Sequence, residues 1–278
     1  MQRTELLNQR RTENKPIVET RTLTKRFRHL TAVDKLSISV QQGEMFGLVG
    51  PNGAGKTTVI KMLTTILPPT SGNALVGGYD IVKHSALVRS VIGYVPQLLS
   101  ADGALTAYEN LLIFAKLYHI PRKEREVRIR DALSFMGLSE FADKMVREFS
   151  GGMIRRLEVA ESMLHRPRML FLDEPTVGLD PIARKTVWEH VQRLRSDYGT
   201  TILLTTHYME EADELCDRIA IMHLGKVAAI GTPTELKASV GEGTTLDDVF
   251  VHYSGYEVDS GGNWREVSST RRVARRLG

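Results

Sequence analysis

The sequence contains no long apolar run. Nowhere in its 278 residues does a stretch approach the roughly 18 consecutive apolar residues of a membrane-spanning helix. The segment from Met1 to Lys15 is polar and charged, unlike the apolar centre of a secretory signal peptide. We therefore expect any association with a membrane to come through a partner protein.

Cysteine is also scarce. The one cysteine, Cys216, rules out an internal disulfide and indicates a reducing compartment. It is spaced with the apolar residues Ala212, Leu215 and Ile219, so we expect a small buried side chain rather than a nucleophile. Apart from His207, the histidines show no metal-ligand spacing, and the chain has no internal repeat.

The composition is that of a globular protein. With 42% hydrophobic residues, the chain is able to bury an α/β core in one or two domains. A net charge of +4 could favour a nucleotide or an anionic lipid, but a solvated surface accounts for it equally well. We expect no nucleic-acid partner.

The clearest motif is a glycine-rich segment between the apolar run 45–49 and a helix-compatible segment. It consists of Gly50, Pro51, Asn52, Gly53, Ala54, Gly55, Lys56, Thr57 and Thr58. The pattern G-x-x-x-x-G-K-[ST] binds polyphosphate, because a main chain that wraps phosphate with its own N–H groups needs conformations that only glycine adopts at low cost. We expect Lys56 to reach the β- and γ-phosphates of a nucleotide and the Thr57 hydroxyl to bind Mg²⁺. The N-terminus of the next helix adds free N–H donors and the positive end of its dipole.

The remaining pattern alternates short strands with helices. Strands are expected at 17–23, 36–40, 45–49, 73–76, 91–95, 168–172 and 201–205, a hairpin at 218–230, and helices at 59–67, after Thr106, from Pro121 to Gly137, over 154–165, from Pro181 to Gly199 and from Thr232. Thr106 and Glu109 form a capping-box pattern, and a proline start with a glycine stop brackets the following helix.

These elements predict a discontinuous core. We expect an α/β core at 17–97 and 167–232, a helical insertion at 98–166, a short C-terminal extension at 233–254, and disordered or flexible ends at 1–16 and 255–278, the latter basic.

A second glycine motif, Phe149-Ser150-Gly151-Gly152-Met153, precedes a helical run. Ser150 is placed to cap that helix, and two glycines with exposed N–H groups at a helix start make another anion site. One nucleotide does not need two such sites, unless the second serves a nucleotide held by another chain.

With these motifs in order, residues 17–235 resemble the ATP-binding subunits of ABC transporters. The resemblance implies a RecA-like P-loop NTPase core, of α/β class, with an antiparallel β part and an inserted helical subdomain. It also implies ATP hydrolysis with Mg²⁺. The family's signature is L-S-G-G-Q, from which Phe149 and Met153 depart; a thioether cannot replace the amide's hydrogen bonds to the nucleotide sugar.

Three further residues match family positions that contact the nucleotide or its Mg²⁺. Two lie in the first part of the predicted core and one in the second. Phe27 matches the aromatic residue that stacks on adenine, although a core phenylalanine at a strand end is the alternative. Gln97 matches the glutamine that senses Mg²⁺ and the attacking water, or is simply a polar residue entering a loop. Asp173 ends a strand too apolar for an unpaired charge, and it matches the carboxylate that supports Mg²⁺.

The other matches concern hydrolysis and assembly. Glu174 matches the general base; two adjacent carboxylates near a triphosphate would repel unless a metal and a bound water share the site. His207 matches the histidine that contacts the γ-phosphate. Asp180 could be only the N-cap of the helix at Pro181, but in the family this position also crosses the dimer interface.

The resemblance further implies a homodimer that closes head to tail around two ATP molecules, at the cytoplasmic face of the membrane, on a separate permease. The closest group contains daunorubicin-type resistance and nodulation-factor export ATPases, judged from three segments: 149–157, 210–213 and 245–250. The alternatives are an importer subunit, which would have the same ATPase motifs, and a soluble ABC ATPase, which would carry two cassettes.

An apolar segment follows Gln97 and suggests a permease contact. In the family, a groove between this loop and the helical subdomain receives a helix of the membrane subunit. We expect the groove to be lined by Leu98, Leu99, Leu105 and Tyr108. The alternative is that they pack inside the helical subdomain.

Overall fold

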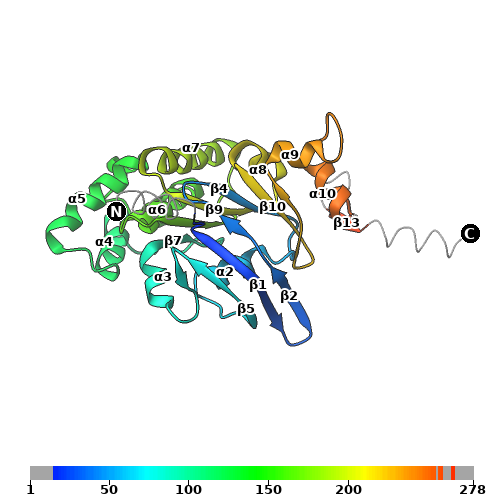
Figure 1. Cartoon of the computed structure of the whole chain (residues 1–278). Coiled ribbons are helices and arrows are strands. Elements are labelled where there is room, and N and C mark those ends of the chain that lie inside the picture. The colour runs from blue at the N-terminus through cyan, green and yellow to red at the C-terminus, as the bar shows by residue number, and fades with distance from the viewer. Residues whose placement is uncertain (1–14, 255, 259–263, 267–278) are drawn as a thin grey trace, which may run out of the picture.

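The computed structural model describes residues 15–254, 256–258 and 264–266. Most of the disordered segment predicted at 1–16 and of the flexible basic tail predicted at 255–278 lies outside the described residues. Within the predicted tail, 256–258 and 264–266 are described and pair as two short antiparallel strands. In Figure 1 the strands form two groups, with most helices on one side of the larger group.

A six-stranded sheet forms the centre of the molecule, in the order β11-β10-β4-β9-β8-β7. Its strands are β4 (Met45–Val49), β7 (Ile92–Val95), β8 (Met169–Asp173), β9 (Thr201–Thr206), β10 (Arg218–His223) and β11 (Lys226–Gly231). All neighbours pair in parallel except β10 and β11, which form an antiparallel hairpin. The carboxyl ends of β4, β8 and β9 therefore meet at one edge of the sheet.

The sheet is buried on both faces, and β8 shows how its sequence achieves this. Leu170 and Leu172 pack into a cluster with the larger group of helices, whereas Met169 and Phe171 pack on the other face. Successive side chains of a strand point to opposite faces, so a continuous apolar run suits a parallel strand covered on both sides.

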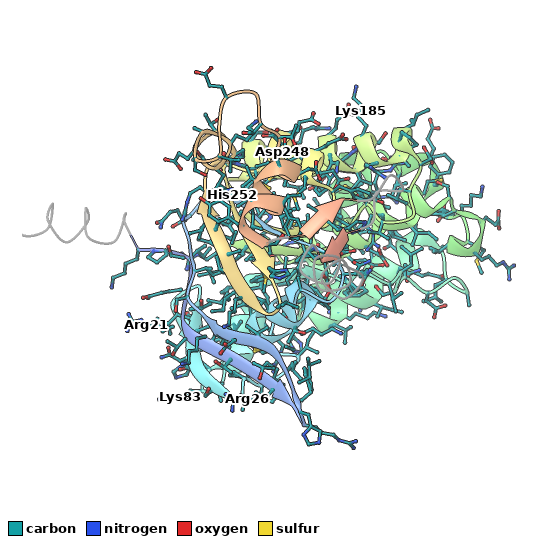
Figure 2. All side chains as sticks on the ribbon, turned by 90° about the vertical axis from the view of Figure 1, so that its right-hand side faces the viewer. Arg21, Arg26, Lys83, Lys185, Asp248 and His252 are labelled. Atoms are coloured by element: carbon teal, nitrogen blue, oxygen red, sulfur yellow. The ribbon has the colours of Figure 1, made fainter. Side chains whose placement is uncertain are left out.

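A smaller antiparallel sheet covers the second face together with α2 (Lys56–Leu63). Its strands are β1 (Val18–Phe27), β2 (Leu30–Leu36), β3 (Ser39–Val40), β5 (Ser71–Val76) and β6 (Tyr79–Asp80), in the order β2-β1-β5-β6 with β3 beside β1. Figure 2 shows the labelled Arg21, Arg26 and Lys83 at the end of the molecule that this sheet forms, and all three are exposed.

Helices fill the chain between the neighbouring strands β7 and β8. They are α4 (Ala107–Leu117), α5 (Arg122–Phe135) and α6 (Gly151–Met163), with 3₁₀ turns at Ser139–Phe141 and Val146–Glu148. The Thr106–Glu109 capping box is present, as predicted. These helices lie at one end of the molecule (Figure 1).

The other helices are α3 (Ser85–Val91), α7 (Pro181–Tyr198), α8 (Met209–Leu215), α9 (Pro233–Ala238) and α10 (Leu246–Ser254); two short strands, β12 (Tyr256–Val258) and β13 (Trp264–Glu266), follow. Cys216 is buried, as expected. No helix within the described residues has both the length and the apolar character needed to cross a membrane.

Several predicted elements were wrong in their limits: β1 continues to Phe27, four residues beyond its expected end, and β5 starts at Ser71, two residues before its expected start. The strand expected at 36–40 is divided, because the Ile38 N–H donates to the Thr20 hydroxyl at 2.8 Å instead of continuing a ladder. The helix expected at 59–67 starts at Lys56 and ends at Leu63, since Thr65 takes a left-handed φ of 65°. The elements β6, α3, α8, α10, β12 and β13 and most of β2 were not predicted; most of them have too few residues to show a period.

Candidate functional site

The glycine-rich loop connects the end of β4 to the start of α2. Gly55 precedes the helix with φ of 104°, a value that favours glycine. A Cβ at this position would lie 2.4 Å from the carbonyl oxygen of Ala32, so a larger residue would also collide with the main chain. The loop conformation therefore depends on glycine in two independent ways.

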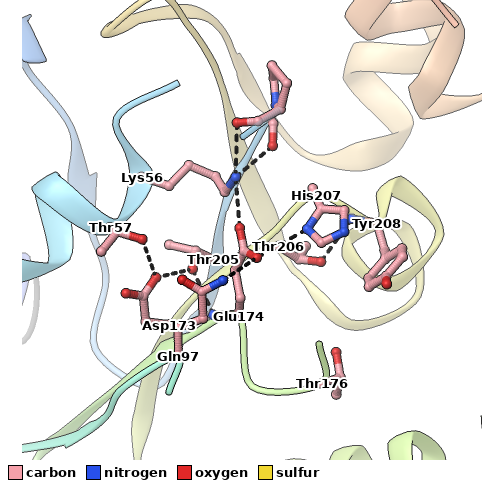
Figure 3. A network of polar contacts seen from close by, with 12 residues as sticks. Lys56, Thr57, Gln97, Asp173, Glu174, Thr176, Thr205, Thr206, His207 and Tyr208 are labelled. Atoms are coloured by element: carbon pink, nitrogen blue, oxygen red, sulfur yellow. Dashed lines mark hydrogen bonds and ion pairs between the residues drawn. The ribbon is translucent and has the colours of Figure 1, made fainter. Parts of the chain in front are cut away.

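Lys56, the first residue of α2, is almost fully buried beneath the loop. Its Nζ donates to the carbonyl oxygens of Gly50 at 2.8 Å and Pro51 at 3.2 Å. The same ammonium lies 3.0 Å from Oε1 of Glu174 (Figure 3). A buried cation paired in this way brings the phosphate loop and the end of β8 into one site.

Asp173 is held by two hydroxyl groups. Thr57 Oγ1 donates to its Oδ1 at 3.0 Å and Thr205 Oγ1 donates to the same oxygen at 2.8 Å (Figure 3). Burial raises the pKa of Asp173, although the two hydroxyl bonds oppose the shift. Its Oδ2 is buried and has no hydrogen-bond partner among the described residues.

Glu174 has a strained backbone and several partners. Its φ is 48°, in the left-handed region, and its N–H donates to the Thr205 hydroxyl at 2.9 Å. Oε2 lies 3.2 Å from Nδ1 of His207 and accepts from Nε2 of Gln97 at 3.4 Å (Figure 3). Burial alone would raise the pKa of Glu174, but His207 and the Lys56 charge outweigh it and lower the pKa to about 2.

Lys56, Thr57, Gln97 and Glu174 border a cavity of about 640 Å³, whereas Asp173 and His207 are not among its lining residues. Its lining includes the predicted residues Phe27, Asn52, Gly53, Gly55, Lys56, Thr57, Thr58, Gln97 and Glu174, together with Leu30, Thr31, Ala32, Leu224 and Gly225. Phe27 is 44% exposed at the end of β1, so its ring is not a core side chain. The cavity has the size and the mixed polar and apolar lining of a small-molecule site.

The second glycine motif does not border this cavity. Among the described residues that line this cavity, none belongs to Ser150–Gly152, and Asp180 is not among them. Ser150 caps α6 by accepting from the Met153 N–H, as predicted. Gly152 also has an intrachain reason to be glycine, because a Cβ there would lie 2.8 Å from the Cβ of Ala183 on α7.

Asp180 caps α7, accepting from the N–H groups of Ile182 at 3.0 Å and Ala183 at 2.9 Å. Phe149 is buried and packs edge-on against Phe141, which accommodates its departure from the family's leucine. Among the proposed docking residues, Leu98 and Leu99 are exposed, whereas Tyr108 packs against the helical core and bonds to Glu126.

Several polar residues of the site were not predicted. Besides Thr205, the buried Glu211 on α8 accepts from Thr176 at 2.8 Å and from Thr206 at 3.0 Å. The signal available was the polar pair Thr205-Thr206 at the end of an apolar strand, directly before His207. Glu211 itself is one of several acidic residues on a short helix, and nothing in its spacing distinguishes it.

The residues fit a nucleotide triphosphate and a hard cation. The Thr57 hydroxyl donates to Oδ1 of Asp173, and Oδ2 of the same carboxylate is buried without a partner among the described residues. Carboxylate and hydroxyl oxygens are ligands that Mg²⁺ accepts together with phosphate. The glycine loop and helix N-terminus supply the N–H donors that phosphate needs.

A phosphate loop after a parallel strand, with two acidic residues and a histidine at the ends of β8 and β9, defines a P-loop ATPase. The chain belongs to the ABC transporter family, whose model matches residues 33–177. It is an ATP-binding subunit of that family and hydrolyses ATP.

Two relatives identify the group within the family. The daunorubicin/doxorubicin resistance ATP-binding protein DrrA of Streptomyces peucetius is 44% identical over 224 residues, 81% of this chain and 68% of that protein. The Nod factor export ATP-binding protein I of Ralstonia nicotianae is 45% identical over 221 residues, 80% of this chain and 68% of that protein. The predicted resemblance to this exporter group is confirmed.

Solved structures agree with the fold. An ATP-binding subunit of an ABC transporter matches with a TM-score of 0.76 at 29% identity, covering 85% of this chain and 99% of that one. The predicted α/β class, with its antiparallel part and helical insertion, is confirmed.

Proposed function

We propose that two copies of this chain close head to tail around two ATP molecules and drive export through a separate membrane permease. The observation that carries the proposal is the separation of the two anion-binding motifs. The phosphate loop lines the cavity, whereas Ser150–Gly152 does not, so each chain has two half-sites that a second copy would complete. Asp180, at the start of α7 beside this segment, would cross the same interface.

Phe27 would stack on adenine, since its exposed ring borders the cavity. The segment from Gly50 to Thr58 would hold the phosphates through its N–H groups, with Lys56 reaching the β- and γ-phosphates. Thr57, Gln97 and Asp173 would hold Mg²⁺, which supplies charge stabilisation at the phosphoryl oxygens when bound.

Glu174 is the proposed general base, and His207 would contact the γ-phosphate. In this arrangement Lys56 and His207 both stabilise the Glu174 carboxylate and keep its pKa low. A triphosphate would draw the Lys56 ammonium toward phosphate oxygens, and loss of that contact would raise the pKa of Glu174. A base whose proton affinity rises as the substrate binds is suited to accept a proton from water.

The permease contact is proposed at the loop after β7, around Leu98 and Leu99. Their exposure beside Gln97 supports this position, whereas Leu105 and Tyr108 would form only its half-buried margin. The chain would then work at the cytoplasmic face of the membrane. The proposed division is a core at 17–97 and 167–232, a helical subdomain at 98–166 and an extension at 233–254.

The direction of transport can be tested in inverted membrane vesicles that contain the chain and the membrane permease with which it co-purifies. Daunorubicin serves as the probe, because a relative is named for resistance to it. ATP-dependent accumulation of daunorubicin that Lys56→Ala abolishes would support export. ATP-dependent loss of preloaded daunorubicin from the same vesicles would contradict it and favour import.

A further inference from the structure

The loop after β7 carries two features of the proposed function at once. Gln97 donates to Glu174 inside the site, and the next residue, Leu98, is 82% exposed. Residues 96–101 have no helical or strand structure. Something other than regular secondary structure must therefore hold the main chain of this loop in place.

Arg155 on α6 holds the beginning of the loop. Its Nη1 donates to the carbonyl oxygen of Pro96 at 2.6 Å and its Nη2 donates to the carbonyl oxygen of Gln97 at 2.7 Å. The side chain is 2% exposed. A planar guanidinium that binds two successive carbonyls fixes the orientation of the peptide between them, which a single ammonium could not do.

Glu158, one turn further along α6, holds the end of the loop. It accepts hydrogen bonds from both the N–H and the hydroxyl of Ser100, the latter at 3.1 Å. Its Oε2 lies 2.9 Å from Nη1 of Arg155, and the Glu158 side chain is also 2% exposed. The two charged side chains therefore form one buried pair that binds both ends of residues 96–100.

Global stability is a poor explanation for this pair. Burial raises the pKa of Glu158 and lowers that of Arg155, so both charged forms are disfavoured by their surroundings. Replacing a buried ion pair by apolar residues of similar volume is often neutral or stabilising. What an apolar pair could not provide is the set of hydrogen bonds to the loop.

The position of the pair on α6 also links the Gln97 loop to the Ser150–Gly152 segment. This helix begins at Gly151, directly after its cap Ser150, and it rises about 1.5 Å per residue. Arg155 thus lies little more than one turn from the segment that is proposed to face the ATP of a second copy. The same rigid helix holds that segment and the loop of Gln97.

We propose that Arg155 and Glu158 are positioning residues that fix the Gln97 loop on α6, so that the Gln97 side chain is presented to Glu174. The proposal rests on the proposed function, in which Gln97 assists hydrolysis. The pair does not touch the nucleotide; it acts through Gln97. Its removal should reduce turnover while ATP affinity changes little.

The test is a kinetic cycle on the purified full-length chain. Arg155→Met combined with Glu158→Leu should lower kcat about 10- to 100-fold with little change in KM, since a small misplacement of a catalytic group has effects of this size. The same pair of changes made on a Gln97→Ala background should lower kcat no further, because the group that the pair positions is already gone. Arg156→Met is the matched control, since Arg156 lies on the same helix but donates to Met136.

Two outcomes would overturn the proposal: an unchanged kcat in the double variant, or an equal fall in kcat in both backgrounds. If Gln97→Ala alone leaves kcat unchanged, Gln97 does not assist hydrolysis, and the result refutes that part of the proposed function. If the variant with Arg155→Met and Glu158→Leu fails to fold, Arg155→Lys replaces it in the test, with and without Gln97→Ala. It retains the charge but cannot bind both carbonyls, so kcat should fall only where Gln97 is present.

Discussion

Asp173 and Glu174 are adjacent carboxylates with opposite electrostatic surroundings. Asp173 faces two hydroxyl groups and its pKa is raised by burial, whereas Glu174 faces Lys56 and His207 and its pKa is lowered to about 2. Neighbouring acids whose pKa values are shifted in opposite directions are suited to different roles. The roles proposed for them are support of a cation by Asp173 and activation of water by Glu174.

Replacing Glu174 by glutamine tests its role. The amide preserves size but cannot accept a proton, so Glu174→Gln should keep ATP binding and slow hydrolysis by at least about a hundredfold. At high protein concentration the variant should also accumulate as an ATP-bound dimer. ATP turnover and size-exclusion chromatography measure the two effects; hydrolysis at the wild-type rate would refute the assignment.

Glu161 on α6 makes stability depend on pH. The residue is 2% exposed, and burial together with the Glu158 charge raises its pKa from 4.5 to about 8. Because the folded-state pKa lies above the unfolded value, its contribution to the free energy of unfolding is complete below about pH 4.5. It is then lost as the pH rises toward 8.

Glu161→Gln should remove this dependence. The neutral amide should make the variant more stable than the wild type at pH 9, by an amount on the order of a few kcal/mol, with near equality at pH 5. Urea unfolding across pH 5–9 measures the difference, with the exposed Glu140→Gln as control. A variant less stable than the wild type at pH 9 would show that the folded protein does not disfavour the Glu161 carboxylate, and so that its pKa is not raised.

At the scale of elements, the loop between β7 and α4 has two sides with different partners. Its inner side is held by α6 and carries Gln97, while Leu98 and Leu99 project outward with 82% and 49% exposure. A substitution on the outer side can therefore affect binding of another protein without disturbing the core.

Leu99→Asp should abolish co-purification with the permease and transport, because a carboxylate in an apolar contact must be desolvated without a partner. The isolated variant should remain folded and bind ATP. Leu117→Asp is a suitable control, since Leu117 is 65% exposed on α4, outside this loop. If Leu99→Asp still co-purifies with the permease, or if it unfolds the isolated chain, the docking position is wrong.

For the whole molecule, the proposal to test is that two chains share each ATP site. A mixture of Lys56→Ala and Ser150→Arg chains tests it. In a head-to-tail dimer of these two, one composite site has both defects and the other has neither. Each variant alone should be inactive, and the mixture should recover part of the ATPase activity.

Tags of two kinds on the variants would show how many mixed dimers form. Activity should follow that number as the mixing ratio changes. If mixed dimers form and activity stays at the level of the separate variants, ATP is not shared between the phosphate loop of one chain and the Ser150 segment of the other.

The sequence by itself determined the features that depend on neighbouring residues. Main-chain conformation and capping bonds depend on consecutive residues. The sequence therefore predicted the phosphate loop, the helical insertion and the helix caps at Thr106, Ser150 and Asp180. The family resemblance could be stated for the same reason. The predicted roles of the site residues remain predictions that the experiments above address.

Only the tertiary structure decided which distant groups meet. The contact between Lys56 and Glu174, the hydroxyl bonds of Thr205 and the hold of Arg155 on the Gln97 loop depend on strand order, register and the packing of α6. Those contacts join segments that are far apart in the chain. They form because burial of both faces of the central sheet stabilises the fold that brings these segments together. A local sequence pattern shows that a residue is polar, but the residues that it contacts depend on the tertiary structure.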